Sequence, residues 1–87
     1  MTLKAKITDL GRHKWSGEVQ FNTMNGLLRE IRKHLMSRSI DIETEDGSNV
    51  GSVIVGGFRA VGKIELLDGV FRIAVTEDVT VIPKPKD

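Results

Sequence analysis

The single tryptophan of the chain lies in a short basic segment whose residue types could bind phosphates and bases. Arg12, Lys14 and Trp15 fall within a loop between Gly11 and Gly17. Arginine and lysine hold a phosphate backbone, and the flat indole can stack on an unpaired base. The segment is therefore suited to single-stranded nucleic acid. Two other interpretations stay open, because a lone Trp can also fill the edge of a core or anchor a protein partner.

A second basic cluster follows on a predicted helix. Arg29, Arg32 and Lys33 stand at positions i, i+3 and i+4, so their side chains fall within one turn on one face. Three cations at this spacing can contact neighbouring phosphates. The alternative is a solvated helix face, since cations near the C-terminus of a helix also favour its macrodipole.

The charges are divided along the chain. Residues 1–38 contain eight Lys and Arg against three acids, a net charge of +5, and residues 39–87 contain five against nine, a net charge of −4. Together they give the formal net charge of +1. A basic half next to an acidic half indicates a polyanion, an acidic protein or a second copy of the chain as the partner.

The remaining polar residues do not have the spacing of a catalytic or metal site. Asp41, Glu43 and Glu45 alternate on one strand face, where carboxylates can bind a hard cation or simply keep a strand solvated. His13 and His34 stand alone in sequence, without a ligand at metal spacing. The chain has no Cys, which excludes disulfides and thiolate chemistry. We expect a non-enzymatic protein with no cofactor and no metal.

The hydrophobic periodicity predicts one helix over residues 23–37. Apolar residues repeat at helical spacing along one face, at Met24, Leu27, Leu28, Ile31 and Leu35. Asn22 or Thr23 can cap the N-terminus of this helix. The residues expected to be buried are Leu27, Leu28, Ile31 and Leu35.

Alternating apolar and polar residues predict strands on both sides of the helix. Residues 2–21 have the pattern of a hairpin with a long basic tip, and further strands are expected at residues 40–45, 50–55 and 58–66. Val79 and Val81 indicate a last short strand.

Asp68-Gly69 is the strongest turn signal in the chain. A type I′ turn requires positive φ at both central residues, a conformation that this dipeptide favours. The hairpin register would pair Leu66 with Phe71 and Glu65 with Arg72. The predicted order β-β-α-β-β-β-β belongs to the α+β class, with one amphipathic helix packed on a strongly bent antiparallel sheet that could curl into a barrel.

One helix can cover only one face of such a sheet. Ile54, Val61 and Ala74 point to the other face, and the strand at 50–55 has no charged residue. An uncharged strand is normally central in a sheet or paired with another chain. The sheet is therefore expected either to close into a barrel or to use its second face as an interface, which predicts a homo-oligomer.

Residues 53–75 resemble the first motif of the Sm-like RNA-binding barrels. Gly57, Gly62 and Asp68 match the turn glycine, the strand glycine and the aspartate of that motif. A helix precedes the strands, as in that family, so the resemblance implies a small oligomeric barrel that binds RNA. An additional hairpin before the helix and an additional strand at residues 40–45 depart from the family pattern.

The length fits one domain, which we place at residues 1–83, followed by a flexible tail at residues 84–87. The N-terminus has no signal-peptide pattern and no apolar run is long enough for a membrane span, so we expect a cytoplasmic protein with no membrane contact. We expect a small binding protein that engages nucleic acid through Arg12, Lys14, Trp15, Arg29, Arg32 and Lys33. The alternative is a protein-interaction or self-assembling module that uses the apolar sheet face and the acidic strand.

Overall fold

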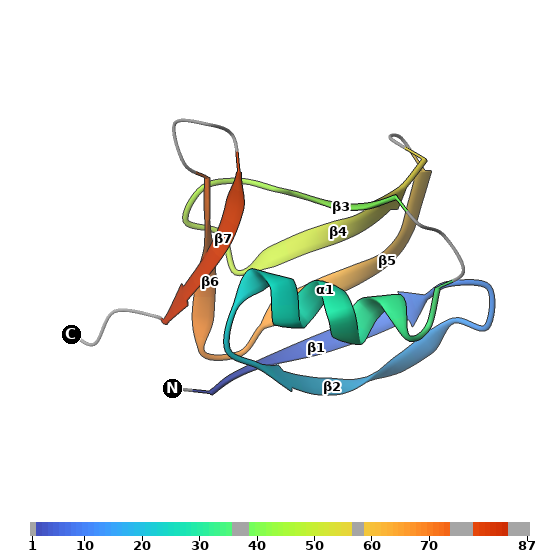
Figure 1. The fold of residues 1–87 in the computed structure, drawn as a ribbon, viewed down its shortest axis with the longest axis horizontal. Helices are drawn as coiled ribbons and strands as arrows, with labels where there is room; N and C mark the ends of the chain where they lie inside the picture. The colour runs from blue at the N-terminus through green and yellow to red at the C-terminus, as the bar shows by residue number, and fades with distance from the viewer. Residues whose placement is uncertain (1, 36–38, 57–58, 74–77, 84–87) are drawn as a thin grey trace.

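The chain forms a curved five-stranded sheet, one helix and a small second sheet (Figure 1). The computed structural model describes residues 2–35, 39–56, 59–73 and 78–83. Within these ranges the elements are β1 (Leu3–Leu10), β2 (Trp15–Phe21), α1 (Met24–Arg32), β3 (Ile40–Thr44), β4 (Val50–Val55), β5 (Arg59–Leu66), β6 (Gly69–Ile73) and β7 (Val79–Pro83). Their types confirm the predicted α+β class, while five strands follow the helix where the predicted order has four.

The five-stranded sheet is open. Its strand order is β2-β1-β5-β4-β3, and every neighbouring pair is antiparallel. β2 and β3 form the two edges, and α1 lies across the side toward which the sheet curves (Figure 1). β6 and β7 form a separate antiparallel pair. The antiparallel sheet is thus confirmed, whereas a closed barrel is not formed.

Helix α1 begins where the sequence predicts and ends earlier. Thr23 is the N-cap, and its hydroxyl oxygen accepts the backbone N–H of Gly26 at 3.2 Å. The helix ends at Arg32, and the N–H of His34 then donates to the carbonyl of Ile31 at 3.0 Å. This bond to the third residue back tightens the last turn and ends the α-helix.

The buried face of α1 is narrower than predicted. Leu27 and Ile31 are fully buried, whereas Leu28 and Leu35 are only partly buried at the edge of the core. Residues 36–38, which the prediction included in the helix, lie outside the described residues. No helix in the described part of the chain is long and apolar enough to cross a lipid bilayer.

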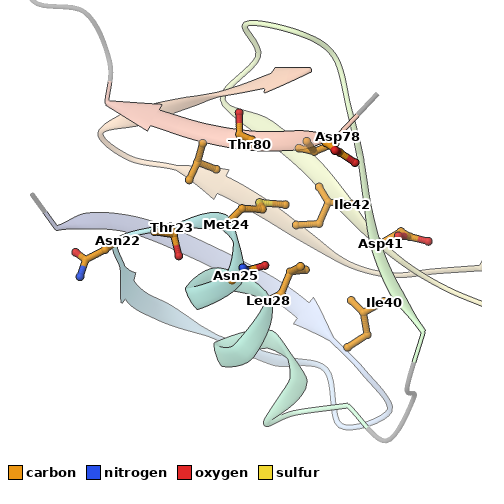
Figure 2. Close-up of a pocket in the computed structure, with 12 residues that line it drawn as sticks. Asn22, Thr23, Met24, Asn25, Leu28, Ile40, Asp41, Ile42, Asp78 and Thr80 are labelled. Carbon is orange, nitrogen blue, oxygen red and sulfur yellow. The ribbon is translucent and has the colours of Figure 1, made fainter. Parts of the chain in front are cut away.

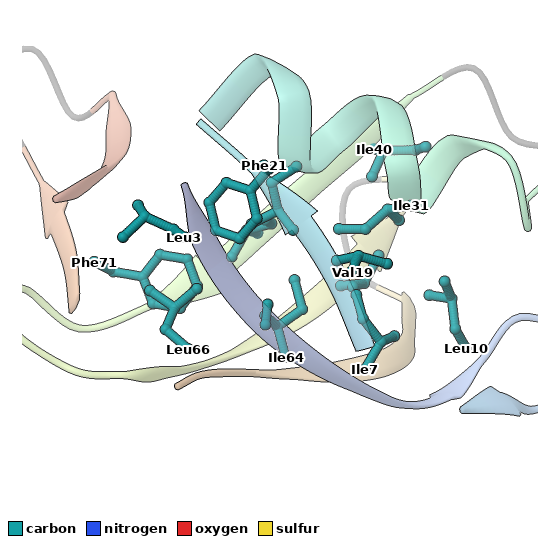
Figure 3. Close-up of a cluster of buried hydrophobic side chains, with 14 residues drawn as sticks. Leu3, Ile7, Leu10, Val19, Phe21, Ile31, Ile40, Ile64, Leu66 and Phe71 are labelled. Carbon is teal, nitrogen blue, oxygen red and sulfur yellow. The ribbon is translucent and has the colours of Figure 1, made fainter. Parts of the chain in front are cut away.

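The core lies between α1 and the sheet, and an aromatic side chain from the second sheet completes it (Figure 3). The register of β1 and β5 places Ile7 opposite Ile64 on the face toward the helix. The largest fully buried side chains are Phe71, Ile7, Leu10, Leu27, Ile31, Ile64 and Val53. Burial of each side chain of this size stabilises the fold by roughly 1.5–3 kcal/mol.

The predicted Asp68-Gly69 hairpin is wrong, because both edges of β5 are already paired, with β1 and with β4. The Asp68 carboxylate instead accepts the backbone N–H of Lys4 at 2.8 Å, and the N–H of Leu67 donates to the Lys4 carbonyl at 2.9 Å. Neither Asp68 nor Gly69 has positive φ, so no type I′ turn forms. The chain therefore leaves the first sheet after β5.

Strand β6 attaches instead to the turn between β3 and β4. The N–H of Gly47 donates to the Phe71 carbonyl, and the N–H of Phe71 donates to the Ser48 carbonyl, both at 2.7 Å. The Asp46 carboxylate accepts the backbone N–H of Ile73 at 2.9 Å and a guanidinium N–H of Arg72 at 3.4 Å. Arg72 thus pairs with Asp46 and does not face Glu65 as predicted.

The sheet face opposite the helix is mainly polar. Its exposed polar side chains are Lys4, Lys6, Glu18, Gln20, Asp41, Glu43, Lys63 and Glu65. Val50, which pairs with Glu65, adds one apolar side chain that is 53% exposed. Ile54 shares this face with Asp41 but is only 7% exposed, so it offers a partner little surface. A bulge makes Val61 the extra residue of β5, where it is half-buried against the core. Ala74 lies outside the described residues, and the homo-oligomer stays a prediction.

Ile31→Ala is expected to lower the free energy of unfolding by about 2–5 kcal/mol, because it leaves a cavity at a fully buried position. Lys33→Ala is expected to lower it by less than about 1 kcal/mol, since the ion pair of Lys33 with Glu30 is exposed to solvent. Chemical denaturation of both variants measures the difference. Equal losses would contradict this assignment of the buried helix face.

Substitutions at Gly69 test how closely β6 lies against β7. A Cβ atom at Gly69 would lie 2.6 Å from the carbonyl oxygen of Ile82, so Gly69→Ala and Gly69→Asn are both expected to cost about 1–3 kcal/mol. If Asp68 and Gly69 formed a type I′ turn, Gly69→Asn would hardly change the free energy of unfolding, because Asn tolerates positive φ. Gly56, with a φ of +63° and open space around it, supplies the control variant Gly56→Asn, which should cost less in thermal unfolding.

Candidate functional site

The tip of the β1–β2 hairpin contains three residues in the left-handed region of backbone conformation. These are Asp9 with a φ of 52°, Gly11 with 74° and Lys14 with 51°. The N–H of Lys14 donates to the Gly11 carbonyl at 3.1 Å, and the N–H of Asp9 donates to the Ser16 hydroxyl at 3.2 Å. The tip is therefore a defined turn, in which the backbone of Lys14 has a conformation that is unfavourable for a residue with a Cβ atom.

The tip is held between β5 and the C-terminal end of α1. On one side the N–H of Gly11 donates to the carbonyl of Val61 at 2.8 Å. On the other side a Cβ atom at Gly11 would lie 2.9 Å from the carbonyl oxygen of His34. Glycine is required here by its positive φ and by this close approach. The hairpin tip and the helix end are consequently neighbours in space.

Trp15 and His34 form the second link between the hairpin and the helix. Their ring centroids lie 3.8 Å apart and their planes differ by 13°, which is a parallel stack. Trp15 is half-buried and packs against the edge of the core, whereas His34 is exposed. The indole also lies against Gly17, where a Cβ atom would be 2.8 Å from the indole Cζ2. Trp15 thus does fill the edge of the core, and its stacking partner within the chain is a histidine.

The two segments that carry the cations predicted to bind nucleic acid are neighbours at this end of the molecule. The tip and the C-terminal end of α1 lie together on the right in Figure 1. We call the group Arg12, Lys14, Arg29, Arg32 and Lys33 the basic end, and all five residues are exposed.

Two acids lie within the same segments as the basic end. Glu30 pairs with Lys33 at 3.0 Å, and Asp9 lies at the start of the tip. Both partners of the Glu30–Lys33 pair remain accessible to solvent, so the pair contributes little energy and leaves Lys33 able to reach a ligand. The basic end therefore keeps a clear excess of positive charge.

One residue of this end was missed by the sequence reasoning. His34 had no ligand at metal spacing, and nothing local shows that it would meet an indole from a hairpin 19 positions earlier.

Two hollows lie elsewhere on the surface. A groove of about 690 Å³ runs between the start of α1, β3 and β7, and Met24 and Ile42 point into it (Figure 2). Its charged lining residues are Asp41 and Asp78, both acidic. A second hollow of about 700 Å³ lies on the polar sheet face, next to Lys63 and three glutamates. Among the described residues, no three His, Asp or Glu side chains are close enough together to hold a metal ion.

Comparison of the chain with known proteins gave no match to a protein-family model, to a curated protein or to a solved structure. The resemblance of residues 53–75 to the Sm-like motif does not extend to the strand pairing, because β6 leaves the sheet that contains β4 and β5. A functional assignment therefore depends on the geometry of the chain itself.

Lys14→Gly is expected to raise the free energy of unfolding by about 1 kcal/mol, because glycine adopts the left-handed conformation without the penalty of a Cβ atom. Arg12→Gly is the matched control: Arg12 is an equally exposed tip cation, but its φ is not positive, so glycine should give no gain. Thermal and chemical unfolding compare the two variants. A loss of stability in Lys14→Gly would show that the lysine side chain itself holds the tip.

Proposed function

We propose that the protein binds nucleic acid through the basic end. The observation that carries this proposal is the stack of Trp15 on His34, which joins the hairpin tip to the helix end. The contact places the hairpin tip, which carries Arg12 and Lys14, next to the C-terminal end of α1, which carries Arg32 (Figure 1). Nearness of the two segments supports the proposal, because a single strand can then contact cations from both.

The binding energy should come mainly from phosphate contacts. The five side chains of the basic end are exposed and carry long flexible chains, which suits contact with a mobile phosphate backbone. Residues 9–17 contain no Asn or Gln, the side chains best suited to read adenine edges. Little sequence preference is therefore expected.

The backbone of Lys14 gives a second line of support. A lysine in the left-handed conformation costs roughly 1–2 kcal/mol relative to glycine. Residues held in such conformations tend to cluster at functional sites, where the strain fixes the direction of a side chain. A binding role for the Lys14 ammonium accounts for a lysine at a position that glycine would fill more stably.

The function is proposed as binding without catalysis. The rival proposal, a protein-interaction module, needs an apolar contact surface. Among the described residues the exposed large apolar side chains are Val50 and Leu67, which lie next to Glu65 and Asp68. Salt dependence separates the two. Phosphate contacts release counterions and weaken steeply with added salt, while an apolar interface responds weakly.

The test is a titration of fluorescein-labelled single-stranded DNA and RNA at several salt concentrations, measured by fluorescence anisotropy. The double variant Arg12→Gln/Arg32→Gln is expected to bind more weakly, with the slope of log K against log salt reduced by about 1.4, since each single-strand phosphate contact contributes about 0.7.

The control removes the same charge from the sheet face opposite the helix. Lys4→Gln/Lys6→Gln loses two exposed cations there and should bind like the unmodified protein. Equal weakening of the two double variants would show attraction by net charge alone, and no binding at about 50 mM salt would remove the proposal.

A further inference from the structure

The stack of Trp15 on His34 leaves the imidazole as the outermost flat surface of the basic end. In a parallel stack each ring gives one face to the other, and here the centroids are 3.8 Å apart. The indole is half-buried and the imidazole is exposed. A base that approaches from solvent therefore meets the face of His34 before it meets the indole.

The indole has little surface left for a ligand. One of its faces is taken by His34, the side chain packs against the core, and it lies so close to Gly17 that a Cβ atom there would be 2.8 Å from Cζ2. For a base to stack directly on Trp15, the imidazole would have to move away. The sequence suggested that a base stacks directly on Trp15. In the structure His34 covers that face of the indole.

We infer that His34 is the base-stacking residue of the site. An unpaired base stacks on the outer face of the imidazole and extends the pair to three layers, in the order Trp15, His34, base. Histidine is among the side chains on which single-stranded bases stack, and such contacts tolerate any sequence because every base has a π-face. This inference rests on the proposed function, since the phosphates must first be held by the basic end.

The surroundings of His34 favour this arrangement. Arg32 and Lys33 directly precede it, and the hairpin tip that carries Arg12 and Lys14 lies against its carbonyl group. A nucleotide stacked on the imidazole thus has cations available from both segments for its flanking phosphates. A duplex offers no free base face along its length, so the site should prefer single strands.

The test uses two substitutions that differ in one property. His34→Phe and His34→Leu both remove the imidazole and both leave an apolar group next to the indole, but only Phe presents a flat ring. Because His34 is exposed, both variants are expected to fold, which thermal unfolding verifies. His13→Leu is the matched control, as it removes the other exposed histidine at the same end.

The probes are a thymidine oligonucleotide of about 12 residues and an abasic phosphodiester strand of the same length and charge. The unmodified protein, His13→Leu and His34→Phe are expected to bind the thymidine strand about tenfold more tightly than the abasic strand, which corresponds to one stacked base. His34→Leu is expected to bind both strands with the same affinity. The comparison in the unmodified protein needs no variant, so the inference can fail even if a substitution disturbs the fold.

The outcomes distinguish a failure of the inference about His34 from a failure of the proposed function. Equal, salt-dependent binding of both strands by the unmodified protein would overturn the role of His34 and leave phosphate binding intact, whereas no binding of either strand would overturn both. Trp15 is the only tryptophan, so its emission reports on the indole. Strong quenching by the thymidine strand in the unmodified protein would place the base on Trp15 and overturn the assignment to His34.

Discussion

The antiparallel pairing of β1 with β5 is the contact on which the remaining structure depends. It joins the N-terminal hairpin to the later strands in one sheet, with Ala5 opposite Leu66 and Ile7 opposite Ile64. Without it the chain would consist of two separate strand groups with a helix between them. The pairing also aligns the apolar faces of all five strands on one side, and this side is where Leu27 of the helix is buried. A single hydrophobic core results from a contact between segments nearly sixty residues apart.

The same pairing determines where β6 goes. Because β5 lies between β1 and β4, it has no free edge for the strand that follows it in sequence. The chain turns away, and β6 attaches to the β3–β4 turn through Gly47, Ser48 and Asp46. Phe71 is thereby placed in the core from a second sheet. The loss of one hairpin is offset by hydrogen bonds to the turn and by burial of an aromatic ring.

The basic end is a further consequence of this arrangement. β5 bonds to the hairpin tip at Gly11, and the helix end closes on the tip from the other side through the stack of His34 on Trp15. The tip is thus fixed although it lies at the surface. Within it Lys14 keeps a left-handed backbone, which a residue with a Cβ atom disfavours.

The amino-acid sequence by itself determined the features that depend on local periodicity. The helix with its Thr23 cap, the alternating strands and the basic hairpin tip follow from spacings of 3.6 and 2 residues and from local hydrogen bonds. The tertiary structure alone decided which strands pair, because several strands compete for the same edges and only the global arrangement settles the competition. The absence of a hairpin at Asp68-Gly69, the burial of Ile54 and the stack of Trp15 on His34 belong to this second group. Each depends on contacts between residues far apart in the chain, which no local pattern records.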